Sequence, residues 1–132
     1  MTGKKRVLFV CVENAGRSQM AEAFAKEQDN GSFEMFSAGS NPAKSINPVM
    51  VSAMKEFNID ISGNIPKGFS ELPYSEYEYV VTMGCGDSCP FIPAKEHIDW
   101  KLEDPKGKSI ETIRKIRDEI RGKVIAFMKG LS

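Results

Sequence analysis

Apolar positions along the chain follow two spacings that alternate from the N-terminal end onwards. Short, nearly continuous apolar runs that are rich in β-branched and aromatic residues are typical of buried strands. Such runs predict strands at 6–11, 33–38 and 78–83, and residues 97–102 are consistent with a fourth. The segments between these runs have a different spacing, with apolar residues at every third or fourth position.

This second spacing indicates amphipathic helices. One helix is predicted at 18–28, and another begins at Asn47-Pro48, because asparagine is a favoured N-cap and proline fits the first turn. Ser109 caps a third, long helix. Its apolar stripe consists of Ile110, Ile113, Ile116, Ile120, Val124 and Phe127. Strands that alternate with helices predict an α/β fold in which a parallel sheet is covered on both faces.

Size and composition fit a single globular domain over residues 1–132. The 18 basic and 18 acidic residues give zero net charge and are interspersed, which argues against binding to nucleic acid or to an anionic membrane. The longest apolar run, 7–12, is far shorter than a membrane span, and no signal-peptide cleavage pattern follows it. We therefore expect a cytoplasmic protein. Three cysteines, an odd number, suit reduced thiols better than a disulfide scaffold.

The segment between the first strand and the first helix carries the most informative chemistry. It consists of Cys11, Val12, Glu13, Asn14, Ala15, Gly16, Arg17 and Ser18. A loop of this length at a helix N-terminus can wrap its backbone amides around a tetrahedral oxyanion, and Arg17 adds a planar fork for two oxygens. Cys11 would lie at the base of this loop, where the amides, Arg17 and the Ser18 hydroxyl favour its thiolate. A buried structural cysteine beside a surface arginine is the simpler alternative, but the surrounding strand, Gly16 and helix favour an anion-binding nucleophile.

These residues resemble a known family. Cys-x5-Arg-Ser, followed by Gln19-Met20-Ala21-Glu22, is similar to the low-molecular-weight protein tyrosine phosphatase superfamily, and within it to the arsenate reductase branch. The resemblance covers the whole chain. Further segments in family order are Phe36-Ser37-Ala38-Gly39, Asn47-Pro48, Ile59-Asp60-Ile61-Ser62, Val80-Val81-Thr82 and Glu103-Asp104-Pro105.

The resemblance implies one domain with a four-stranded parallel sheet and helices on both faces. It also implies that Asp104 lies over Cys11 as the general acid that protonates the leaving oxygen, although a plain Asp-Pro turn is the alternative. Eukaryotic-type phosphatases of the family carry tyrosines after the Asp-Pro pair, where this chain has Lys106-Gly107-Lys108. That difference favours the reductase branch over an aryl phosphatase.

Two further cysteines, Cys85 and Cys89, support the same choice, because a phosphatase needs one thiol whereas a reductase needs thiols that supply two electrons. The resemblance implies that Cys11 attacks arsenate, that Cys85 then forms a disulfide with Cys11, and that Cys89 displaces Cys11. Thioredoxin, or glutaredoxin with glutathione, would restore the thiols, and no cofactor is implied. The Cys85-x3-Cys89 spacing is shorter than in well-known thioredoxin-coupled members, so the relay order and the reductant stay open.

Three alternatives are weaker. A phosphatase would use Cys11, Arg17 and Asp104 but leave the other cysteines idle. A phosphocysteine carrier has a similar loop, but it must not hydrolyse its own phosphocysteine. Arg17 and Asp104 would promote that hydrolysis, so they argue against a carrier. A zinc site of three cysteines and His97 would take Cys11 from the oxyanion loop.

The resemblance also concerns the support beneath the loop. It implies that Asn14 braces the loop through side-chain hydrogen bonds. Some arsenate reductases bind potassium there through residues that match Asn14, Glu22 and Ser37, together with an aspartate. Lys67 falls about where that aspartate should be, which argues against potassium. Lys67 is expected either to bring its own charge near Glu22 or to be a solvated lysine.

Overall fold

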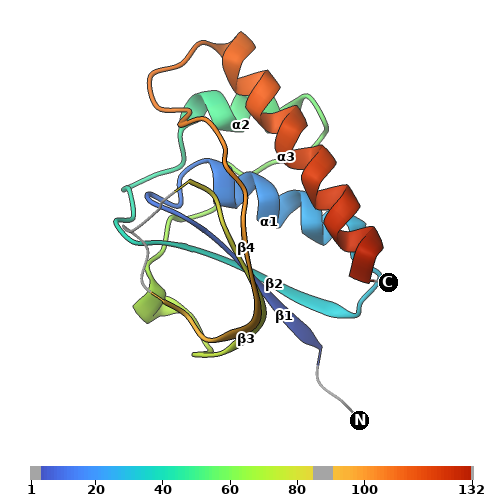
Figure 1. The fold of residues 1–132 in the computed structure, drawn as a ribbon. Coiled ribbons are helices and arrows are strands. Elements are labelled where there is room, and N and C mark those ends of the chain that lie inside the picture. Colours follow the sequence, from blue (N-terminus) through green and yellow to red (C-terminus); the bar gives the residue numbers. More distant parts are fainter. Residues whose placement is uncertain (1–3, 85–90, 132) are drawn as a thin grey trace.

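The computed structural model describes residues 4–84 and 91–131. Strands and helices alternate as the apolar spacings predict as far as β3, which β4 follows with no helix among the described residues (Figure 1). The elements are β1 (Lys5–Cys11), α1 (Arg17–Gln28), β2 (Phe33–Gly39), α2 (Pro48–Lys55), the 3-10 helix η1 (Phe69–Glu71), β3 (Tyr77–Thr82), β4 (Ala94–Asp99) and α3 (Ile110–Leu131). None of the helices in the described part of the chain is long and apolar enough to cross a membrane.

The four strands form one parallel sheet in the order β2-β1-β3-β4, which confirms the predicted parallel sheet. β1 is central and pairs with β2 on one side and β3 on the other. After β1 the chain therefore forms β2 on one side of β1, and it later crosses to the other side of β1 to form β3. In open parallel sheets ligands bind at such a switch point, beyond the carboxyl ends of the strands. Cys11 is the last residue of β1, so it lies at this point.

The two faces of the sheet are covered unequally. All three α-helices pack on one face, where they bury Val7 and Phe9 of β1 (Figure 1). The opposite face, with Leu8 and Val10, is covered by η1 and the extended segments next to it. The cover expected on both faces thus consists of three α-helices on one face and, among the described residues, of the 3-10 helix η1 on the other.

The fourth strand lies three residues earlier than the predicted 97–102. β4 spans Ala94–Asp99 and is an edge strand on which His97 is exposed. Trp100 and Leu102 follow the strand, and their side chains are buried in the core although their backbone is no longer in the sheet. The apolar pattern therefore predicted the burial of Trp100 and Leu102 correctly, but it wrongly placed them in a strand.

An ion-pair cluster joins α2 to α3. Glu56, directly after α2, lies 2.7 Å from the Arg114 guanidinium and 2.5 Å from that of Arg117, both on α3. Hydrogen bonds from Arg114, and then from Arg117, lower the pKa of Glu56 from 4.5 to about 2. Because the pKa is lower in the folded state, Glu56 stabilises the fold above about pH 4.5, and this contribution disappears as the pH falls towards 2.

We therefore expect Glu56→Gln to lower the melting temperature at pH 7, and the difference from wild type to vanish by about pH 2. Thermal unfolding followed by circular dichroism across this range measures both effects. Glu119→Gln, at an exposed position of α3, is the matched control and should change little. A destabilisation by Glu56→Gln that is the same at every pH would contradict this role of the carboxylate.

Candidate active site

A pocket of about 290 Å³ opens at the carboxyl end of β1. It brings together Cys11, Arg17 and Asp104, which the sequence placed in two distant segments. Cys11 is only 2% exposed. The lining residues are Cys11, Val12, Glu13, Ala15, Gly16, Arg17, Asn47, Gly84, Leu102, Asp104, Pro105 and Lys106. Cys85 and Cys89 lie outside the described residues.

The loop 12–16 is held from outside by the segment 41–47. Three loop carbonyls accept hydrogen bonds from backbone amides of that segment: Asn41 N–H to Val12 O (2.8 Å), Ala43 N–H to Glu13 O (3.0 Å) and Asn47 N–H to Ala15 O (3.0 Å). In a trans peptide the N–H points opposite to the carbonyl, so the amides that follow these carbonyls face the other way. The N–H groups of residues 12–16 donate to no acceptor among the described residues. Free backbone amides in such a loop are the groups that a backbone nest offers to an anion.

Gly39 lets the loop pass close to the end of β2. It pairs with Cys11 in the sheet, and a Cβ at position 39 would lie 2.5 Å from the Val12 carbonyl oxygen and 2.8 Å from the Asn14 amide nitrogen. Both contacts involve backbone atoms, which cannot rotate away as the end of a side chain could. Only glycine therefore fits here without moving the loop.

Gly39→Ala is accordingly expected to reduce activity at least tenfold and to destabilise the fold by about 1–3 kcal/mol, the usual cost of overpacking. Steady-state assays and urea unfolding measure the two effects. Gly122→Ala on α3 is the control, because a Cβ there meets nothing within 4 Å and alanine favours a helix. Wild-type activity in Gly39→Ala would show that the loop tolerates the displacement.

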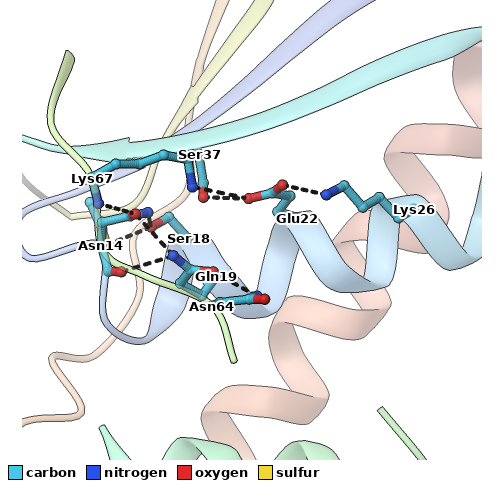
Figure 2. Close-up of polar contacts among 9 residues, drawn as sticks. Asn14, Ser18, Gln19, Glu22, Lys26, Ser37, Asn64 and Lys67 are labelled. Carbon is cyan, nitrogen blue, oxygen red and sulfur yellow. Dashed lines mark hydrogen bonds and ion pairs between the residues drawn. The ribbon is translucent and has the colours of Figure 1, made fainter. Parts of the chain in front are cut away.

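Asn14 supports the loop from behind, as the resemblance implies. It is buried with a left-handed φ of 51°. Its Oδ1 accepts from the Lys67 backbone N–H and from Gln19 Nε2, both at 2.9 Å, and its Nδ2 donates to Ser18 Oγ at 2.7 Å (Figure 2). A backbone N–H can only donate, so the contact with Lys67 requires the Asn14 oxygen on that side and its NH₂ towards Ser18. The contact thus sets the orientation of the amide.

The orientation of Asn14 determines what Ser18 can do. Ser18 Oγ lies 2.9 Å from Cys11 Sγ. Because the hydroxyl already accepts from Asn14, its own hydrogen is available to donate to the sulfur, and a thiolate can only accept. The chain of contacts therefore leads from the Lys67 backbone through Asn14 and Ser18 to the Cys11 sulfur. Asn14 and Ser18 do not line the pocket, so they act on the sulfur and on the loop from behind.

Arg17 and Asp104 approach the pocket from other sides. Arg17 is the first residue of α1, is largely buried, and donates from Nη1 to the Leu102 carbonyl at 3.4 Å. Gly84 leaves room for this guanidinium, since a Cβ there would lie 2.8 Å from Nη1. Asp104 is exposed at the rim, and its Oδ1 accepts from the Lys106 backbone N–H at 3.0 Å.

A buried carboxylate lies further along α1. Glu22 accepts a short hydrogen bond from Ser37 Oγ, and its other oxygen lies 2.7 Å from Lys26 Nζ (Figure 2). Lys67 Nζ is 4.0 Å from Glu22 Oε1, which confirms the prediction that Lys67 brings its charge near Glu22. Lys67 thus contacts the support of the loop at two points, through its backbone and through its ammonium.

Sequence reasoning missed the parts of this site that depend on tertiary contact. Asn47 was predicted only as a helix cap, yet its N–H holds the Ala15 carbonyl and it lines the pocket. The cap role is confirmed, since Asn47 Oδ1 accepts from the Val49 N–H. Gly84 and Leu102 gave no chemical signal, because one acts through an absent side chain and the other through its backbone oxygen.

Comparisons with known proteins cover nearly the whole chain. The chain is 36% identical over 131 residues to a protein named glutaredoxin arsenate reductase from Synechocystis sp., covering 97% of this chain and 99% of that one. A solved structure titled an arsenate reductase in the oxidized state superposes with a TM-score of 0.86 at 34% identity, over 97% of this chain and 99% of the other. A thioredoxin-dependent arsenate reductase of Corynebacterium glutamicum superposes with a TM-score of 0.79 at 37% identity, over 98% of this chain but 62% of that longer chain.

The family assignment rests on nearly the full length of the sequence. The sequence profile described as low molecular weight phosphotyrosine protein phosphatase matches residues 6–132, which include the loop, the sheet and the Asp104 segment. The fold and the arrangement of the loop are consistent with this match. The chain belongs to the low molecular weight phosphotyrosine protein phosphatase family.

Proposed function

We propose that this protein is a thiol-dependent arsenate reductase. The observation that carries the proposal is a cysteine at the base of a loop with backbone amides left free by the described residues. The Ser18 hydroxyl lies 2.9 Å from its sulfur, and Arg17 and Asp104 line the same pocket. The relatives named arsenate reductase support the same substrate. Thiol chemistry of this kind operates in a reducing compartment such as the cytoplasm.

In the first step the Cys11 thiolate forms an S–As bond to arsenate held by the loop amides and Arg17. Asp104 gives a proton to the departing oxygen, which leaves as water. The Cys85 thiolate then attacks the Cys11 sulfur, so that an S–S bond forms and the electron pair of the S–As bond stays on arsenic. Arsenic(V) is thereby reduced to arsenic(III), and two thiols are oxidised to a disulfide.

The Cys89 thiolate next attacks Cys85 and releases Cys11 as a thiolate. The resulting Cys85–Cys89 disulfide is reduced by an external dithiol. The names of the relatives point to two reductants, glutaredoxin for one and thioredoxin for another, so both belong in the test. The first assay is arsenate-dependent NADPH oxidation with thioredoxin and its reductase, beside an arm with glutathione and glutaredoxin.

Substitution of single cysteines tests the relay itself. Cys89→Ser should complete one turnover and stall with a Cys11–Cys85 disulfide that accumulates only after arsenate is added. Cys85→Ser should stall earlier, before this disulfide. Peptide mapping under non-reducing conditions distinguishes these states. Full-rate turnover by Cys89→Ser without a protein disulfide would replace the relay by direct attack of an external thiol.

Phosphoester hydrolysis is the second candidate, because family membership and the trio Cys11, Arg17 and Asp104 serve it equally well. None of the described residues that line the pocket is aromatic, so an aryl group finds no ring to pack against. Hydrolysis of p-nitrophenyl phosphate should therefore be weak. It should survive both Cys85→Ser and Cys89→Ser, since it needs neither thiol.

A further inference from the structure

A lysine and a glutamate face each other at the mouth of the pocket. Lys106 Nζ is 3.5 Å from Glu13 Oε2, and both residues line the pocket. Glu13 belongs to the oxyanion loop itself, whereas Lys106 follows the Asp104-Pro105 pair. Neither side chain has a part in the chemistry described above. Their position nevertheless places both charges beside any anion that enters.

The charges around the pocket show why the pair matters. Among the described lining residues, Arg17 and Lys106 are basic while Glu13 and Asp104 are acidic. An oxyanion substrate adds further negative charge. Without Lys106, the incoming anion would meet an uncompensated carboxylate at the edge of its own binding loop. Such repulsion extends over about one Debye length, ~10 Å at 0.1 M ionic strength, and is screened by salt.

We propose that Lys106 determines substrate affinity by neutralising Glu13, so that a small inorganic oxyanion can enter the loop. The proposal rests on the proposed function only for the identity of that anion. Lys106 also positions Asp104, but it does so through its backbone N–H, which donates to Asp104 Oδ1. A side-chain substitution therefore tests the charge and leaves this hydrogen bond in place.

The chain offers a matched control two residues away. Lys108 Nζ lies 3.5 Å from Glu103 Oε2, the same separation as in the pocket pair, and neither Lys108 nor Glu103 lines the pocket. Lys108→Met removes the same charge from the same loop. It separates a local effect at the mouth from a change in the net charge of the protein.

The test is isothermal titration of the full chain, with thiols reduced, using inorganic phosphate, which binds as an oxyanion but is not reduced. We expect Lys106→Met to weaken phosphate binding about three- to fivefold at low ionic strength, the range of exposed charge interactions, and less in 0.5 M salt. Lys106→Arg and Lys108→Met should bind like wild type. The double variant Glu13→Gln/Lys106→Met should recover wild-type affinity, and in arsenate turnover Lys106→Met should raise KM with kcat unchanged.

Three results would overturn the proposal: unchanged affinity in Lys106→Met, a double variant as weak as Lys106→Met, or an equal loss in Lys108→Met. The second would mean that Lys106 contacts the anion without regard to Glu13, and the third that only net charge matters. A protein that bound phosphate as expected but reduced no arsenate would contradict the proposed function and leave this inference intact. The two failures are therefore distinguishable.

Discussion

Replacing Cys11 with serine is expected to reduce arsenate turnover and p-nitrophenyl phosphate hydrolysis below detection. A serine hydroxyl is a far weaker nucleophile than a thiolate at neutral pH unless a base activates it. The protein's single histidine, His97, is exposed on β4 and bonds to the Ile92 carbonyl, so it offers no such base to position 11. Steady-state assays with both substrates measure the loss.

The control for this variant is its affinity for phosphate. The loop amides and Arg17 do not depend on the sulfur, so Cys11→Ser should still bind phosphate and melt near the wild-type temperature. Loss of activity with retained binding assigns Cys11 to the chemical step. Substantial turnover by the folded variant would instead place the nucleophile elsewhere.

Arg17→Lys is expected to lose most activity although the charge is kept. The Arg17 guanidinium is buried, and its bond to the Leu102 carbonyl uses one nitrogen, so the rest of the planar fork can serve two substrate oxygens. A lysine ammonium lacks this planar arrangement of donors, so it cannot bond the Leu102 carbonyl and also hold two substrate oxygens. Loss of an oxyanion donor typically costs about 2.7–4 kcal/mol in the transition state, or about 100- to 1,000-fold in kcat.

Arg121→Lys on α3 is a suitable control, because Arg121 lies over the Phe57 ring, far along the chain from the loop, and does not line the pocket. It should retain wild-type kinetics. If Arg17→Lys behaved in the same way, the guanidinium would not face the anion. Measuring kcat and KM separately shows whether the loss arises in the chemical step.

The sequence was most informative where function depends on neighbours along the chain. The loop from Cys11 to Ser18 lies between one strand and one helix, so its place in the fold followed from local patterns. β4 was placed three residues too late because Trp100 is buried after the strand ends, and burial alone does not fix backbone conformation. The resemblance, rather than any pattern, indicated Asp104.

Contacts between distant segments could not be predicted in this way. Gly39 approaches Val12 only because β1 and β2 pair in a register that ends both strands together. The pair of Glu13 and Lys106 joins residues 93 positions apart. Nothing in the local sequence distinguishes Lys106 from Lys108, and only the path of the chain after β4 brings one of them to the pocket.

The unequal cover of the sheet has a consequence for motion. Regions with few buried apolar contacts open by local unfolding at a lower free energy than well-packed ones, so η1 and the segments next to it should exchange their amide hydrogens sooner than the α-helices. Lys67, whose N–H orients Asn14, lies two residues before η1. Each brief opening there would remove the Lys67 N–H from Asn14 Oδ1, while Gln19 Nε2 keeps its own bond to that oxygen. The polar contacts behind Cys11 thus connect, through Lys67, to the side of the sheet away from the α-helices.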